Sequence, residues 1–182
     1  HIKINTVLKS LIDLKNLEEK NSSIKALAYQ LYENNGVLKR EQVSSYLKTL
    51  GQNERKILRE LGVKFGRYHV FLYQLIKPEA VSLRTLLWKN FHQKYYNLKP
   101  PTFGLNFLDD KDSKNKNFML LCGFEKFDTL FVRIDILERL FMQIINTDTK
   151  DNKEIKIIPE MLNLLGCSKD NFKKLLKKMG YK

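Results

Sequence analysis

Apolar residues at helical spacing dominate the first third of the chain. They form stripes suited to one buried helix face over residues 5–18, 22–35, 40–50 and 53–62. Gly36, Gly51 and Gly62 stand at the ends of the last three stretches, where glycine commonly terminates a helix. This pattern predicts a helical N-terminal part.

A different pattern begins at residue 63. Residues 63–72 are rich in aromatic and β-branched residues, which is typical of a strand. Gly66 within this stretch indicates a bulge or a close approach of the backbone. Pro78 suits the first position of a further helix, which we expect to reach about Phe91.

The pair Pro100-Pro101 interrupts the helical pattern and marks the boundary that we place between two subdomains. We expect a helical subdomain over residues 1–99 and an α+β subdomain over residues 100–182. In the second subdomain, the pattern predicts short strands over 118–124 and 130–134, which would form a β-hairpin, and a helix over about 135–145.

The C-terminal residues show the clearest local signals. Residues 155–158 resemble a short strand. Pro159 and Gly166 fit the two ends of one helix, and Ser168 and Gly180 fit the cap and terminator of the next. We therefore predict a helix–turn–helix over 159–180, which would also fit a winged-helix fold. The fold class expected for the whole chain is helix-rich α+β.

The net charge of the chain narrows the classes of partner that it could bind. The 182 residues carry a formal net charge of +13. Segment 36–67 has eight Lys and Arg against three Glu, and segment 161–182 has six Lys against one Asp, so each contributes +5. A charge of this size repels itself unless a polyanion is near, and nucleic acid is the commonest such partner. An anionic membrane surface is the second possible partner. The remaining alternative is a generally lysine-rich surface without a specific partner.

The terminal helix carries one candidate binding cluster. Lys173 and Lys177, like Lys174 and Lys178, are like-charge pairs four residues apart, an arrangement that costs a few tenths of a kcal/mol in isolation. Phosphate groups would turn this repulsion into attraction. Lysines in a last turn also favour the helix dipole, which is the structural alternative. The predicted nucleic-acid-binding residues here are Lys169, Lys173, Lys174, Lys177 and Lys178.

A second candidate cluster lies in the predicted strand. Lys64, Arg67, Tyr68 and His69 stand among phenylalanines, and cations interleaved with aromatic rings can hold a single strand by charge and stacking. The alternative is an ordinary core strand with a basic outer face. His69 has no neighbour in sequence that would orient it as a general base.

The sequence offers no catalytic or metal-binding motif. It lacks the phosphate loop, the GxGxxG fingerprint, the HExxH pair and the GxSxG elbow. Its two cysteines form no CxxC pair, so we expect no thiolate metal site and a reducing compartment. The acidic stretch at Asp109, Asp110 and Asp112 departs from a calcium loop. We therefore predict no catalytic residue, metal site or cofactor in this chain, and we rank a metal-dependent nuclease last.

Two further features bear on the cellular location of the protein and on whether the chain is part of a longer polypeptide. No apolar run approaches the ~20 residues that a membrane span needs, and no signal peptide is recognisable. We therefore expect a cytoplasmic protein without a membrane partner. The first residue is His1 rather than Met, so we expect the chain to be part of a longer polypeptide.

Two blocks carry a resemblance to a known family. They are RKILRELGVKFGRYHVFLYQLIKPEAVSLRTLLW at 55–88 and FVRIDILERL at 131–140, the latter followed by PEMLNLLGCSKDNFKKLLKKMGYK at 159–182. Together they resemble the region after the motor core of alphaproteobacterial superfamily II helicases related to the mitochondrial degradosome RNA helicase. The resemblance covers most of residues 50–182. It implies a bacterial ATP-dependent helicase whose ATP and Mg²⁺ site belongs to a motor core absent from this sequence.

Two functional hypotheses follow. The first is a nucleic-acid-binding accessory domain, for RNA or DNA, that works with the helicase core of the same polypeptide. The alternative is a protein-interaction or docking module of the same helicase, whose working surface would be the neutral, apolar-rich block at 118–145. The sequence does not distinguish RNA from DNA or a single strand from a duplex.

Overall fold

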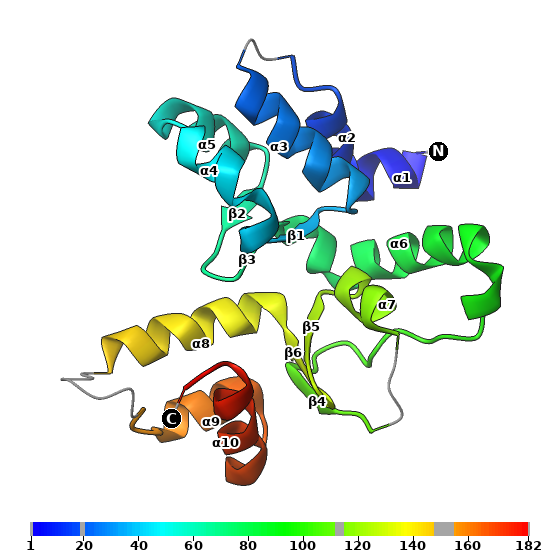
Figure 1. The fold of residues 1–182 in the computed structure, drawn as a ribbon. Coiled ribbons are helices and arrows are strands. Elements are labelled where there is room, and N and C mark those ends of the chain that lie inside the picture. Colours follow the sequence, from blue (N-terminus) through cyan, green and yellow to red (C-terminus); the bar gives the residue numbers. More distant parts are fainter. Residues whose placement is uncertain (1, 19–20, 112–114, 148–154, 182) are drawn as a thin grey trace. The chain divides into compact units, whose positions relative to one another are not determined.

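The computed structural model describes residues 2–18, 21–111, 115–147 and 155–181 (Figure 1). The chain divides into two compact units, residues 1–100 and 101–182, and the dividing peptide joins Pro100 to Pro101. Each unit combines helices with a three-stranded antiparallel sheet. The predicted helix-rich α+β class is confirmed.

Unit 1 is built from helices around one small sheet. Its helices are α1 (Ile2–Val7), α2 (Lys9–Lys15), α3 (Ser22–Glu33), α4 (Ser44–Thr49), α5 (Gln52–Glu60) and α6 (Pro78–Phe91). Its strands are β1 (Val37–Lys39), β2 (Val63–Phe65) and β3 (His69–Leu72). Short 3₁₀ turns occupy Arg40–Val43, Tyr73–Ile76 and Gln93–Tyr95.

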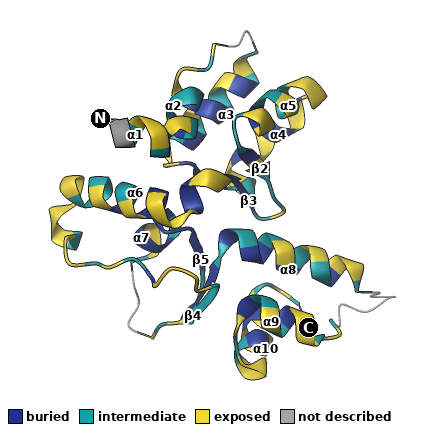
Figure 2. Ribbon diagram, turned by 180° about the vertical axis from the view of Figure 1, so that it is seen from behind, coloured by how far each residue is buried: buried dark blue, intermediate teal, exposed yellow. Residues whose placement is uncertain are grey.

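The core of unit 1 joins these helices to one face of the sheet. Leu27 of α3, Leu58 of α5 and Val70 of β3 are fully buried in one apolar cluster. The remaining stripe of α3 comprises Ile24, Ala28 and Leu31, as the helical spacing predicts. Figure 2 shows the buried residues of α3 along the side that faces this core.

The sheet of unit 1 differs from the predicted single strand over 63–72. Residues 63–72 form a hairpin, β2–β3, whose turn is closed by a hydrogen bond from the Gly66 amide to the His69 carbonyl at 2.8 Å. Strand β1, which the pattern did not predict, pairs with β3, so the strand order is β1-β3-β2. Gly66 thus marks the start of a turn rather than a bulge.

Unit 2 has the same strand order, β4-β6-β5. Its strands are β4 (Phe107–Asp109), β5 (Phe124–Phe127) and β6 (Leu130–Arg133), and its helices are α7 (Lys116–Leu121), α8 (Ile134–Asn146), α9 (Pro159–Leu165) and α10 (Lys169–Lys178). The strand predicted over 118–124 is wrong for its first residues, which form α7. Residues 155–158 have no regular structure, so that predicted strand is also wrong.

The predicted helix–turn–helix over 159–180 is confirmed as α9 and α10. Gly166 ends α9 in the left-handed region, and the Ser168 side chain caps α10 by accepting a hydrogen bond from the Asn171 amide at 3.2 Å. The hairpin β5–β6 precedes this pair in the chain, so it does not follow it as the wing of a winged helix would.

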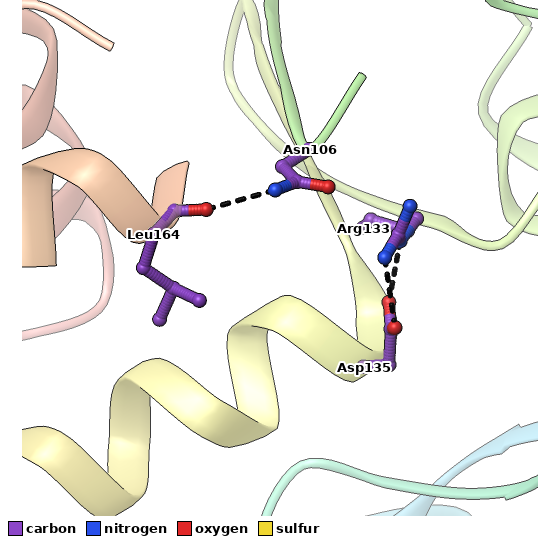
Figure 3. Close-up of polar contacts among 4 residues, drawn as sticks. All are labelled: Asn106, Arg133, Asp135 and Leu164. Atoms are coloured by element: carbon purple, nitrogen blue, oxygen red, sulfur yellow. Dashed lines mark hydrogen bonds and ion pairs between the residues drawn. The ribbon is translucent and has the colours of Figure 1, made fainter. Parts of the chain in front are cut away.

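Two polar contacts help to join the sheet of unit 2 to its helices (Figure 3). The side-chain amide of Asn106 donates to the carbonyl of Leu164 in α9 at 2.9 Å. Arg133, at the end of β6, binds Asp135 of α8 with both Nε and Nη2, at 2.7 and 3.0 Å. The first contact spans 58 positions, and so fixes α9 beside the start of β4.

The two sheets share one hydrogen-bond scheme. Gly62 precedes β2 and its carbonyl accepts from Tyr73, while Gly123 precedes β5 and its carbonyl accepts from Ile134, eleven positions later in both cases. Both glycines have positive φ, 92° and 84°. The units therefore repeat one motif of strand, helix, glycine and hairpin.

Candidate nucleic-acid interface

Helices α4 and α5 form a tight helix–turn–helix in unit 1. Only Leu50 and Gly51 separate them. Arg55, in the first part of α5, donates from Nη2 to the Leu47 carbonyl at 2.6 Å and from Nε to the Leu50 carbonyl at 3.3 Å. These carbonyls lie at the C-terminal end of α4, where the helix cannot satisfy them itself. Arg55 therefore holds the two helices at the turn.

The two faces of α5 differ in character. Leu58 is fully buried, and Ile57 packs against the same core. The opposite face is exposed and polar, with Gln52, Asn53, Lys56, Arg59 and Glu60. Helix α5 thus presents amides and cations outward while its apolar face anchors it.

An aromatic ring connects α5 to the hairpin. The guanidinium groups of Arg55 and Arg59 lie 5.5 and 5.6 Å from the centroid of the Phe65 ring in β2. Contacts of this kind are worth about 0.5–1 kcal/mol at partly exposed sites. They hold the cationic side of α5 against the end of β2 that leads into the turn.

The hairpin is tied to the start of the helix–turn–helix through Arg40. Its Nη1 donates to the Gly66 carbonyl at 2.8 Å, and its backbone amide donates to the Tyr68 carbonyl at 2.8 Å. Arg67 at the turn is exposed, and Tyr68 is half-buried. The structure therefore places Arg67 at the tip of a hairpin whose turn is held on both sides of Arg67 by Arg40.

The structure separates the other two residues of this predicted cluster. Lys64 is exposed, but alternation along β2 directs it to the sheet face opposite Phe65. His69 is only 1% exposed. Its ring therefore lies inside the protein, and a contact of His69 with nucleic acid stays a prediction.

Cations outnumber carboxylates on this part of unit 1. Lys48, Lys56, Arg59, Lys64 and Arg67 are exposed, against Glu41 and Glu60. Glu54, the remaining acid of segment 36–67, accepts a hydrogen bond from Asn21 at 3.2 Å, so it faces the start of α3. The exposed side chains of the helix–turn–helix and the hairpin therefore carry a net positive charge.

The second predicted cluster lies on α10 of unit 2. Phe172, Leu175 and Leu176 are buried and fix the helix orientation. The five predicted lysines, Lys169, Lys173, Lys174, Lys177 and Lys178, are all exposed. Lys178 makes an ion pair of 3.0 Å with Asp128, so its charge is already partly compensated within unit 2.

The equivalent hairpins carry opposite charges. The amide of Arg40 binds the Tyr68 carbonyl, and the amide of Asp110 binds the Thr129 carbonyl in the same way. Arg67 in unit 1 thus corresponds to Asp128 in unit 2. Of these two turn residues, only Arg67 offers a cation to a phosphate.

Comparison with known proteins gives no assignment: no protein family, curated protein or solved structure matches the chain. Within the described residues, no cluster of three or more His, Cys, Asp or Glu side chains is placed to hold a metal ion. Asp112 of the acidic stretch lies outside those residues. No helix in the described part combines the length and apolar character needed to cross a membrane.

Sequence reasoning missed the exposed cations of α5. Lys56 and Arg59 lie three positions apart on the face opposite Leu58. Their signal was present in the charge of segment 36–67 together with the helical spacing of Ile57, Leu58 and Leu61. The aromatic stretch at 63–72 is the stronger local signal for stacking, and it draws the prediction away from α5.

Proposed function

We propose that this chain is a nucleic-acid-binding domain that uses α5 and the hairpin β2–β3. Lys56 and Arg59 on α5 and Arg67 at the hairpin tip are the phosphate contacts. The observation that carries the proposal is the tight pair α4–α5 followed directly by a hairpin, with exposed cations on both. Phosphate neutralisation supplies most of the affinity of such surfaces.

The element order supports a specific docking geometry. Helix α3, strand β1, helices α4 and α5, and hairpin β2–β3, with the strand order β1-β3-β2, follow the order of a winged-helix domain. In helix–turn–helix proteins the second helix enters the major groove. Here that helix is α5. The argument is an analogy of fold, and the named side chains carry the function.

The exposed amides on α5 suit recognition of bases. Gln52 and Asn53 begin the helix and are exposed. Asn and Gln side chains can make paired hydrogen bonds to adenine in the major groove of DNA. The major groove of duplex RNA is too deep and narrow for such contacts. Duplex DNA is therefore the preferred ligand of this surface.

The resemblance of residues 50–182 to helicase tails supplies the cellular role in this proposal. The domain would guide nucleic acid to or from an ATP-driven motor core in the same polypeptide. The ATP and Mg²⁺ of that reaction would belong to the core, and the cytoplasm would be its place of action.

The alternative of a docking module has less support. Most large apolar side chains in block 118–145 are buried in unit 2, including Phe118, Phe131 and Leu137. Met142 and Ile145 at the end of α8 are about half exposed, at 52% and 51%. Two such residues make a small surface for a protein partner.

The test is a binding titration of the full chain with labelled duplex DNA at about 50 and 200 mM salt, the range where counterion release is visible. Lys56→Glu combined with Arg67→Glu should weaken binding at least tenfold and lower the salt slope by about 2, one unit for each lost phosphate contact. Lys116→Glu combined with Lys156→Glu changes the net charge equally at exposed positions of unit 2, and should have a much smaller effect.

Equal weakening by the two double variants would overturn the proposed surface and leave only unspecific attraction. The same titration decides the role of α10. Lys173→Glu with Lys174→Glu should weaken binding only if α10 also contacts phosphate. Because this pair lies in unit 2, its effect is separable from that of α5.

A further inference from the structure

The outer half of α6 carries exposed aromatic rings. Phe91, the last residue of α6, is 86% exposed, and Tyr96, just after the following 3₁₀ turn, is 65% exposed. Figure 2 shows the outer end of α6 largely as exposed surface. Exposed rings that lie together, unlike rings scattered singly over a surface, mark interaction sites.

Further rings at this end of unit 1 stack on one another. The Trp88 ring lies 4.4 Å from the ring of His92 and 5.4 Å from that of Tyr95, measured between centroids. Trp88 and Tyr95 are nearly parallel, at 17°. We call the five residues Trp88, Phe91, His92, Tyr95 and Tyr96 the aromatic platform.

The backbone of the aromatic platform is fixed by consecutive turns. The His92 amide donates to the Trp88 carbonyl at 3.0 Å, and the Tyr95 amide donates to the His92 carbonyl at 2.9 Å. The Tyr96 amide donates to the Gln93 carbonyl at 3.0 Å. The rings are therefore presented by an ordered backbone.

The chain segment that carries the aromatic platform has only positive formal charges. No acidic residue occurs between Glu79 and Asp109. Lys89, Lys94 and Lys99 lie in this interval, and Lys94 Nζ lies 4.8 Å from the centroid of the Tyr95 ring. Cations interleaved with exposed rings, without carboxylates, attract a polyanion that can also stack.

We propose that the aromatic platform binds single-stranded nucleic acid. Unpaired bases would stack on Phe91 and Tyr96, while Lys94 and Lys99 would neutralise the backbone. A base in a duplex is already stacked between its neighbours, so these rings favour unpaired bases. Bases of any sequence present such a face, so we expect little sequence preference.

This site is distinct from the proposed duplex surface. In Figures 1 and 2 the outer end of α6 and helix α5 lie on opposite sides of unit 1. A chain with both sites could hold the duplex and the unpaired strand of one junction. The inference stands on its own contacts and goes beyond duplex binding.

The only tryptophan in the sequence lies in the aromatic platform, which gives a direct readout. The full chain is titrated with unlabelled 15-nucleotide oligo-dT and oligo-U, and with the duplex used above, while Trp88 fluorescence is followed. Single strands should quench Trp88 and saturate. Retained quenching at about 200 mM salt would indicate stacking besides charge.

Phe91→Ala combined with Tyr96→Ala should weaken single-strand binding at least about tenfold, because each stacked base contributes about 1–3 kcal/mol. Duplex binding should change less than twofold. Tyr29→Ala is the control, since Tyr29 on α3 is an exposed ring, 59%, close to the 65% of Tyr96. Fluorescence anisotropy of end-labelled strands gives the affinities for all variants.

Unchanged single-strand affinity in the double variant would overturn the proposal. Equal losses for single strand and duplex would also overturn it, because the aromatic platform would then not be a separate site. A change in sedimentation of the free protein, without a change in binding, would assign the rings to self-association instead. If the duplex fails to bind but single strands quench Trp88, the duplex proposal fails and this one stands.

Discussion

The guanidinium of Arg84 donates a hydrogen bond to the backbone carbonyl of Asn35 at 2.5 Å, across 49 positions of the chain. Its Nη1 also donates to the Leu75 carbonyl at 2.7 Å. Arg84 is 3% exposed. This buried cation connects α6 to the turn before β1, and Asn35 in that turn has a positive φ of 55°.

Replacing Arg84 should therefore destabilise unit 1. Arg84→Met leaves two carbonyls without this donor and should lower the free energy of unfolding by about 2–4 kcal/mol. Arg84→Lys should recover only part of this loss, because an ammonium lacks the fork that reaches both carbonyls. Urea denaturation measures both. Lys25→Met, at an exposed position of α3, is the control, and a similar loss there would contradict the assigned role.

Substitutions of the neighbouring cations Arg55 and Lys56 on α5 should affect folding stability and duplex binding separately. Arg55→Met removes the donor to the Leu47 and Leu50 carbonyls and should cost about 1–3 kcal/mol of folding free energy. Lys56→Met, on the exposed face, should change stability by less than about 0.5 kcal/mol yet weaken duplex binding. Thermal denaturation and the duplex titration are run on both variants. Equal effects of the two substitutions on stability would contradict the role of Arg55 in holding α4 and α5 together at the turn.

Two glycines of positive φ should respond differently to alanine. A methyl group at Gly36, where φ is 79°, would collide with the Leu75 side chain, whereas at Gly104, where φ is 94°, no atom lies within 4 Å. Gly104→Ala should cost only the conformational strain, about 1–2 kcal/mol. Gly36→Ala should cost clearly more, because a buried contact must also move. Equal denaturation midpoints for the two variants would contradict this.

The thiol of Cys167 should react slowly in the folded protein. Burial raises the pKa of the Cys167 thiol from 9.0 to about 11. At pH 8 its thiolate fraction should then be roughly 100-fold below that of the unfolded chain, since the thiolate is the reactive form. Mass spectrometry after timed alkylation, with and without denaturant, measures this. Folded protein that is alkylated at the denatured rate would exclude the burial effect.

The same shift has a consequence for stability. Because the folded pKa is raised, the contribution of this thiol to stability is complete below pH 9.0 and is lost as the pH rises toward 11. Denaturation of wild type and Cys167→Ser between pH 8 and 10.5 should show this loss only in the wild type.

Local signals predicted much of the fold. Gly166 predicted the end of α9 and Ser168 predicted the start of α10, because a left-handed terminator and a hydroxyl cap act within a few residues. The short apolar run at 118–121 was assigned to a strand because periodicity cannot separate a buried strand from a buried helix of that length. The cap was visible: Asn115 accepts hydrogen bonds from the Asn117 and Phe118 amides, both at 3.0 Å.

Pairing over long distances was not predictable in the same way. Strand β1 has only three residues and gains its structure from β3, more than 30 positions later. The candidate site depended on that pairing, because it positions the hairpin after α5. The sequence identified Lys64 and Arg67 as basic, but only the sheet separates the exposed Lys64 from the buried His69.

The two hairpins, β2–β3 and β5–β6, can be compared with each other within the same molecule. Arg67 and Asp128 occupy the same place in two hairpins with the same strand pairing, but Asp128 has a positive φ of 63° and Arg67 does not, so both backbone conformation and side-chain charge differ at this place. A photo-crosslinking group at either position would sample an equivalent place in the strand pairing. Any difference in capture of nucleic acid between the two positions then reports charge, neighbourhood and turn conformation together, within one polypeptide and one experiment.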